Sequence, residues 1–210
     1  MRRRMAPVYR YPSYVTAVRA DDLSSPMPRR LRLTIDLNRP SGSQVLFVMM
    51  NPSKATSQIS DKTVNGVIKY TYEKCLDLST VSRIVVLNLY TVYETASSGL
   101  ANLTEQYGYD CVVGNDSQCE ITNDELITLE SGRSEILIAA WGRPSASTTI
   151  LRESGYFRRV REVLELIADH RPYHMDTYLR EGLYPKHPRG IDYSWVLSRL
   201  DTAKLLRAFR

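Results

Sequence analysis

Residues 45–63 read VLFVMMNPSKATSQISDKT and change abruptly from a continuous apolar run to a polar turn, Asn51-Pro52-Ser53. The apolar part is typical of a strand that is covered on both faces of a sheet. Proline fixes its own φ and biases the preceding residue toward an extended backbone, so the Asn51 side chain would be aimed rather than free. Asp61 is predicted to be the N-cap of the helix that follows.

Two further apolar runs resemble the first one, and together they predict the fold. RIVVLNLY at 83–90 and EILIAAW at 135–141 are nearly continuous, whereas RLRLTIDL at 30–37 alternates as a half-buried strand does. Helical segments are expected at 61–78, 123–130 and 149–168, and a further strand at 174–179. Strands that alternate with helices predict an α/β fold: a three-layer sandwich with a central, mainly parallel sheet of about four core strands.

Sheets of this kind bind ligands outside the carboxyl ends of their strands, where loops and helix N-termini meet. Three polar corners fall at such ends: residues 51–53, 88–90 and 141–145. We therefore expect these corners to line one crevice, and Asn51 to be part of its chemistry.

Length and composition favour one globular domain over residues 1–210, with a basic N-terminal arm at 1–29 and a C-terminal helical extension at 191–210. The sequence has no apolar run of membrane-spanning length and no signal peptide, so we expect a cytoplasmic protein with no membrane partner. The three cysteines and three histidines are too scattered for a zinc site. No metal or other cofactor is expected.

Charge is distributed unevenly along the chain. Residues 1–33 contain eight arginines against two acids, and residues 151–210 contain twelve Lys or Arg against eight acids. Residues 99–135 contain eight acids and a single basic residue. A DNA partner, duplex or single strand, would therefore contact the regions near the two ends of the chain.

Several motifs in order resemble a bacterial and phage domain family of unknown function. LFVMMNPSKATSQISDKTV, the earlier LRLTIDL, and the later VVLNLYTVY, NDEL, AAWG and YPKHPRG carry this resemblance over roughly residues 30 to 190. Members of that family have a strand ending in Gly-Leu-Asn-Pro-Ser, followed by Asp-x-Thr-Val. This chain departs from the pattern at Met49, where a glycine is usual.

The same positions are more distantly similar to the uracil-DNA glycosylase superfamily, which has an Asn-Pro or Asp-Pro corner after its first core strand and a late His-Pro loop. The resemblance implies that Asn51 orients the attacking water, that Asn88 reads a base edge and that His187 stabilises charge on the departing base. This chain has His-Pro-Arg-Gly in place of the usual His-Pro-Ser-Pro, so the phosphate-gripping serine is missing.

The expected function is therefore hydrolysis of the N-glycosidic bond of a uracil-like or modified pyrimidine base in DNA, in a setting such as repair. Further expected contacts are Tyr90, Met50 and Trp141 to the base, and Ser53, Arg143, Ser145, Lys186 and Arg189 to DNA phosphates. Two alternatives stay open: a DNA-base-modifying enzyme of the same fold, and a non-catalytic nucleotide-binding protein.

Overall fold

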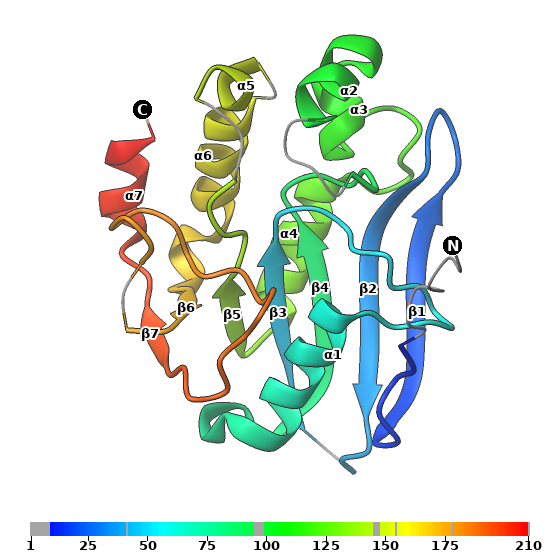
Figure 1. The fold of residues 1–210 in the computed structure, drawn as a ribbon, viewed down its shortest axis with the longest axis vertical. Helices are drawn as coiled ribbons and strands as arrows, with labels where there is room; N and C mark the ends of the chain where they lie inside the picture. The colour runs from blue at the N-terminus through cyan, green and yellow to red at the C-terminus, as the bar shows by residue number, and fades with distance from the viewer. Residues whose placement is uncertain are drawn as a thin grey trace, which may run out of the picture.

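The computed structural model describes residues 9–40, 42–94, 99–144, 148–153, 155–177 and 179–209. Its centre is a seven-stranded sheet with the order β1-β2-β4-β3-β5-β6-β7 (Figure 1). The strands are β1 Val15–Leu23, β2 Arg29–Leu37, β3 Ser43–Met49, β4 Val81–Asn88, β5 Ile136–Ala139, β6 Tyr173–Met175 and β7 Leu197–Arg199. The helices are α1 Lys62–Lys69, α2 Gly99–Tyr107, α3 Tyr109–Val113, α4 Asn123–Arg133, α5 Thr148–Glu153, α6 Tyr156–Ile167 and α7 Thr202–Ala208.

The sheet is mixed, and it is larger than the sequence predicts. The four middle strands, β4, β3, β5 and β6, are parallel, as expected for the core of an α/β fold. The prediction omitted the flanking antiparallel pairings, in which β1 pairs with β2, β2 with β4, and β7 with β6. β1 lies within the range predicted as a basic arm. Its half-exposed edge position explains why its sequence lacks the apolar run of a core strand.

Two hydrophobic layers cover the sheet, and successive residues of β3 alternate between them. Val45, Phe47 and Met49 face the layer of α1, whereas Leu46 and Val48 face the layer of α4 and α6. Figure 1 shows α1 in front of the sheet and α4 and α6 behind it. The predicted three-layer arrangement is therefore present.

The predicted helices form, but two of them are interrupted. The helix expected at 61–78 is α1, followed by a π-helical turn at Tyr70–Lys74 and a 3₁₀ turn at Leu76–Leu78. The helix expected at 149–168 is divided into α5 and α6, and Gly155 has a positive φ of 69° between them. Within the described ranges, no helix has the length and apolar content needed to cross a bilayer.

A buried arginine joins the β1–β2 hairpin to the segment after α3. Arg29 is fully buried, and its Nη1 atom donates to Asp116 at 2.6 Å and to the Cys111 carbonyl at 3.0 Å. Its Nη2 atom donates to the Ser25 carbonyl at 3.1 Å. Removing one partner of a buried ion pair leaves an uncompensated charge in a medium of low dielectric constant.

We predict that Asp116→Ala lowers the free energy of unfolding by about 3 kcal/mol. The control is Arg19→Ala, which breaks the exposed pair with Asp36 and is expected to cost less than about 1 kcal/mol. Urea denaturation followed by circular dichroism measures both values. Equal losses in the two variants would show that the Arg29 charge is compensated without Asp116.

Candidate functional site

A cleft of about 820 Å³ lies at the carboxyl ends of β3 and β5. The loop after β3 leads to α1 on one face of the sheet, whereas the chain after β5 leads to α6 on the other face. The two loops therefore diverge and leave a crevice, as at the switch point of other α/β sheets. The cleft is lined by residues 50–54, 61–63, 141–144 and 185–187, together with Tyr9, Arg180, Arg189 and Trp195.

Asn51 lies in the wall of this cleft and is half-buried. Its Nδ2 atom donates a hydrogen bond to the backbone carbonyl of Glu94, which fixes the orientation of the side-chain amide. The Oδ1 atom of Asn51 is then the acceptor that the amide can offer to a ligand or a water molecule. The aimed side chain predicted from the Asn-Pro corner is consistent with this geometry.

Asp61 caps α1, as predicted. Its Oδ1 atom accepts from the backbone N–H groups of Thr63 at 2.8 Å and Val64 at 2.9 Å. Its Oδ2 atom also accepts from the N–H of Ala55 at 3.1 Å, which ties the loop after Asn51 to the helix. Asp61 lines the cleft as well, so one carboxylate fixes the loop and adds the negative charge of the cleft wall.

The loop at residues 185–189, which we call the late loop, brings His187 to the cleft. The N–H of Arg189 donates to His187 Nδ1 at 2.9 Å, so a neutral imidazole carries its proton on Nε2. Burial and the nearby Arg189 charge lower the pKa of His187 to about 4, although Asp61 opposes the shift. At neutral pH the ring is therefore an uncharged Nε2–H donor.

Gly142 allows the late loop to approach the end of β5. Its φ is +72°, and a Cβ atom added there would lie 2.6 Å from His187 Cβ. Real Cβ atoms do not approach another carbon so closely. The position of His187 relative to the cleft therefore depends on the missing side chain of Gly142.

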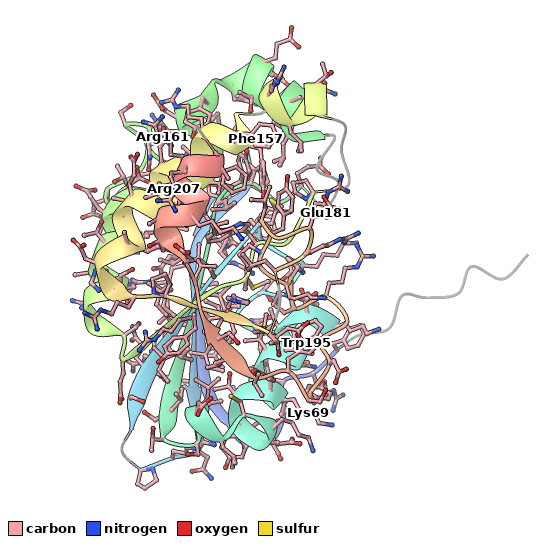
Figure 2. All side chains as sticks on the ribbon, turned by 90° about the vertical axis from the view of Figure 1, so that its left-hand side faces the viewer. Lys69, Phe157, Arg161, Glu181, Trp195 and Arg207 are labelled. Carbon is pink, nitrogen blue, oxygen red and sulfur yellow. The ribbon has the colours of Figure 1, made fainter. Side chains whose placement is uncertain are left out.

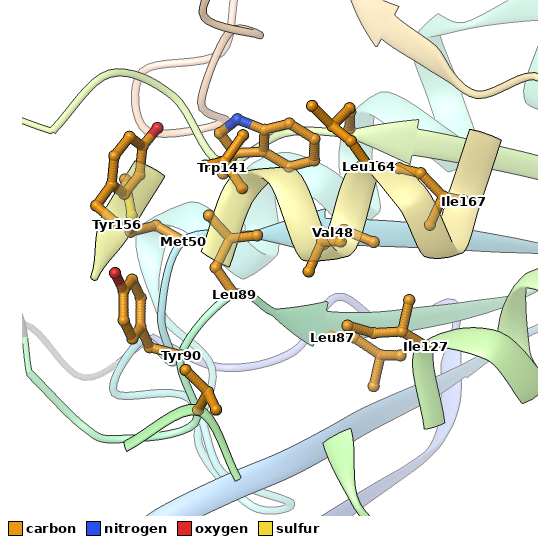
Figure 3. Close-up of a cluster of buried hydrophobic side chains, with 14 of the residues drawn as sticks. Val48, Met50, Leu87, Leu89, Tyr90, Ile127, Trp141, Tyr156, Leu164 and Ile167 are labelled. Atoms are coloured by element: carbon orange, nitrogen blue, oxygen red, sulfur yellow. The ribbon is translucent and has the colours of Figure 1, made fainter. Parts of the chain in front are cut away.

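Met50 and Trp141 form the apolar part of the wall, and both are almost fully buried. Figure 3 shows them packed above Leu89 and beside Tyr156. Trp141 Nε1 is a buried donor with no hydrogen-bond partner among the described residues, and the same holds for Ser53 Oγ. The cleft wall is thus backed by buried apolar side chains and contains two buried polar groups without a partner among the described residues.

The cleft carries many positive side chains, some of which the sequence analysis missed. Of the residues predicted to contact DNA phosphates, Ser53, Arg143, Lys186 and Arg189 line the cleft, and Ser145 lies outside the described residues. Acidic side chains already hold two of the cations, since Arg143 pairs with Glu181 at 3.0 Å and Lys186 pairs with Asp176 at 3.4 Å. The missed cations are Lys54, Lys62 and Arg180. Lys54 lies two residues after Pro52 and Lys62 directly follows the predicted N-cap Asp61, so both could have been inferred from the sequence.

The structure does not bring Asn88 and Tyr90 to the cleft surface. Both are fully buried, and neither is among the residues that line the cleft. Asn88 is the register partner of Met49, and its backbone carbonyl accepts from Asn123 Nδ2 at 2.9 Å. The side-chain amide of Asn88 has no hydrogen-bond partner among the described residues. Any contact between Asn88 and a ligand would therefore take place beneath the corner at Asn51.

Metal binding is not supported by the groups in this cleft. In the parts of the chain that the structure describes, no cluster of three or more His, Cys, Asp or Glu side chains could hold a metal ion.

Comparison with protein-family models finds a match to the family described as "Protein of unknown function (DUF1643)", over residues 30–189. The chain belongs to this family. Neither the curated proteins nor the solved structures contain a match. The DUF1643 range begins in β2 and ends in the late loop, so it includes Asn51, His187 and the loops between them. It leaves out β1, β7, α7 and Trp195.

We predict that Gly142→Ala destabilises the fold by about 2 kcal/mol or more, because it adds a contact with His187 to the cost of a left-handed backbone. Gly182→Ala is the matched control: its φ is +71°, and nothing lies within 4 Å of the added atom. The control should lose about 1 kcal/mol. Urea midpoints measure both values, and equal losses would show that the late loop yields without strain.

The low pKa of His187 predicts a loss of stability in acid. The unfolded chain, with a histidine pKa near its ordinary value of 6.5, takes up a proton before the folded chain does. The stabilisation from neutral His187 is therefore complete above pH 6.5 and is lost as the pH falls toward 4. Between pH 7 and pH 4.5, we expect the free energy of unfolding of His187→Gln to fall by about 2 kcal/mol less than that of the wild type, as measured by urea unfolding. Equal losses of stability in the wild type and in His187→Gln would contradict the lowered pKa of His187.

Proposed function

We propose that this cleft binds one nucleotide of DNA and hydrolyses its N-glycosidic bond, with a uracil-like or modified pyrimidine as the leaving base. The observation that carries this proposal is that Asn51 and a neutral His187, which are far apart in the sequence, line one cleft bordered by cations. The order of the motifs, which resembles that of the uracil-DNA glycosylase superfamily, supports the same reaction.

In the proposed reaction a water molecule attacks the anomeric carbon, and the C–N bond to the base breaks. The Oδ1 atom of Asn51 accepts a hydrogen bond from this water and orients it, while Nδ2 stays bound to the Glu94 carbonyl. An amide is a poor base, so Asn51 contributes position more than proton removal. The reaction therefore depends on stabilising the base as it leaves.

His187 supplies that stabilisation. Its Nε2–H donates to a base oxygen that gains negative charge as the bond breaks, while Nδ1 is held by the Arg189 N–H at 2.9 Å. A donor of this kind typically contributes about 2.7 to 4 kcal/mol to the transition state. The water supplies the hydroxyl to the sugar and a proton to the released base, so the products are an abasic site and a free base.

Met50 and Trp141 form the apolar face on which the extruded base would lie. The indole N–H of Trp141 is buried and unsatisfied among the described residues, so it would donate to the nucleotide only if an acceptor reaches into this wall. Asn88, with its buried amide lacking a partner, would read the base edge only if the base enters beneath the corner. Tyr90, which is fully buried, would support this wall through packing.

The cations favour a substrate with phosphates over a free nucleoside. Lys54, Lys62, Arg180 and Arg189 line the cleft and are exposed, and none of them forms an ion pair with a described residue. They come from two separate parts of the chain, Lys54 and Lys62 from the segment after β3, and Arg180 and Arg189 from the segment after β6. Phosphates on either side of the target nucleotide could therefore be contacted simultaneously.

Mass spectrometry of DNA incubated with the protein tests the proposal. Substrates with normal, uracil-containing and modified pyrimidine bases should include one from which free base is released. We expect His187→Gln to slow release about 100-fold or more, and Asn51→Ala to slow it at least about tenfold. Asn38→Ala, an exposed asparagine after β2, is the matched control and should act like the wild type.

Other products would identify another function. An altered base mass with an intact sugar–base bond would indicate a base-modifying enzyme. Unchanged DNA with every substrate would contradict the proposed reaction and favour a nucleotide-binding protein without chemistry.

A further inference from the structure

Aromatic side chains continue from the cleft onto the surface over α1. Trp195 lines the cleft, and Tyr193 is 37 % exposed two residues before it. Figure 2 shows Trp195 and Lys69, the last residue of α1, close together on one side of the molecule. We call the surface formed by Trp195, Tyr193, Lys69 and Lys186 the aromatic path.

Each ring of the aromatic path carries a lysine. The Lys186 ammonium lies 5.5 Å from the ring centre of Trp195, and the Lys69 ammonium lies 5.2 Å from that of Tyr193. Cation–π attraction holds an ammonium group against a ring without neutralising its charge. Apolar rings and positive charges are therefore paired twice in succession, starting at the cleft.

The segment that carries the rings is anchored to α1. Tyr70, in the turn after α1, donates from its hydroxyl to the Trp195 carbonyl at 2.8 Å. A Cβ atom at Gly66 would lie 3.0 Å from Ile191 Cγ2, so the segment and the helix are in close contact. Because of these contacts, the rings are presented on a fixed support.

The acidic side chain of this segment is already engaged. Asp192 Oδ1 accepts from the Ser194 N–H at 2.9 Å and from the Ser194 hydroxyl at 2.8 Å. These bonds hold the pKa of Asp192 below its ordinary value, so the group is a carboxylate held by its own turn. Asp176 pairs with Lys186 at 3.4 Å, so an incoming phosphate would compete with that carboxylate at Lys186, whereas Lys69 forms no ion pair with a described residue.

Aromatic side chains extend beyond Tyr193 to the start of β1. Tyr14 stacks on Tyr72 with ring centres 4.0 Å apart and an angle of 6° between the planes. Burial, the hydrogen bond to Glu73 and the proximity of Glu73, Tyr193 and Tyr72 raise the pKa of Tyr14. Tyr193 is therefore near this second pair of rings.

We propose that the aromatic path binds single-stranded nucleic acid, namely the nucleotides that flank the one in the cleft. Flanking bases stack on the rings and their phosphates contact Lys186 and Lys69. Bases inside a duplex are stacked on each other and have no free face for a ring, whereas unpaired bases do. The inference rests on the proposed function in one respect, that the near end of the path is the nucleotide-binding cleft.

Fluorescence anisotropy with a labelled oligothymidylate tests this inference. A single strand of about twelve nucleotides would occupy both the cleft and the path, whereas a trinucleotide would fill the cleft alone. We expect Tyr193→Ala to lower the ratio of long-strand to trinucleotide affinity about tenfold, and Tyr193→Phe to restore it. Lys69→Ala should reduce the slope of log affinity against log salt by about 0.7 for the long strand.

Leu129→Ala is the matched control, because Leu129 is also 37 % exposed but lies on α4, behind the sheet. It should bind the long strand like the wild type. Circular dichroism of each variant confirms that the fold is retained.

The possible outcomes separate the path from the proposed reaction. Tyr193-dependent strand binding without release of free base from any DNA would support the path and contradict the glycosidase. Release of free base, together with equal affinities of Tyr193→Ala and wild type for the long strand, would support the glycosidase and contradict the path. No binding by the wild type, or an equal effect of Tyr193→Ala on duplex and single strand, would overturn the path.

Discussion

The parallel pairing of β3 with both of its neighbours is the constraint on which the site depends. β3 pairs with β4 from Ser43 to Met49 and with β5 from Val45 to Val48, so the carboxyl ends of the three strands lie at the same end of the sheet. The pairing continues into the loop after β4, since Leu89 N–H donates to Met49 O and Tyr90 N–H to Met50 O. Any chain segment that follows these strands must therefore begin at this end of the sheet, whatever its own sequence.

Some charged side chains of this protein hold elements of the fold together, whereas others line the cleft. The buried Arg159 of α6 donates to the Leu89 carbonyl at 2.8 Å and to Asp124 at 2.6 Å, which fixes the end of β4 against α4. The cations of the cleft differ, because they are exposed or only half-buried, and the acids that hold two of them, Asp176 and Glu181, lie in the late part of the chain. An anion that enters the cleft would compete with these two carboxylates.

The core and the location of the cleft could be predicted because they depend on short-range patterns. Continuous apolar runs identify doubly covered strands, and the rule for strand ends places Asn51 and Trp141 together. The burial of a residue at a strand end could not be predicted. Alternation indicates which face of the sheet the Asn88 side chain occupies, but not that this side chain is completely covered. The edge strand β7 was missed because three residues, Leu197–Arg199, are too few to show a period.

The region matched by the family model ends at Arg189, but the sheet does not. β7 follows that point, and its pairing from Leu197 to Arg199 covers the outer edge of β6. A chain cut at the family boundary would leave the backbone N–H and C=O groups of β6 without partners on that side. Open edges of this kind can pair with other chains. With the segment after Arg189 in place, the open edge lies on β7, a strand of three residues, and short edge strands limit such pairing.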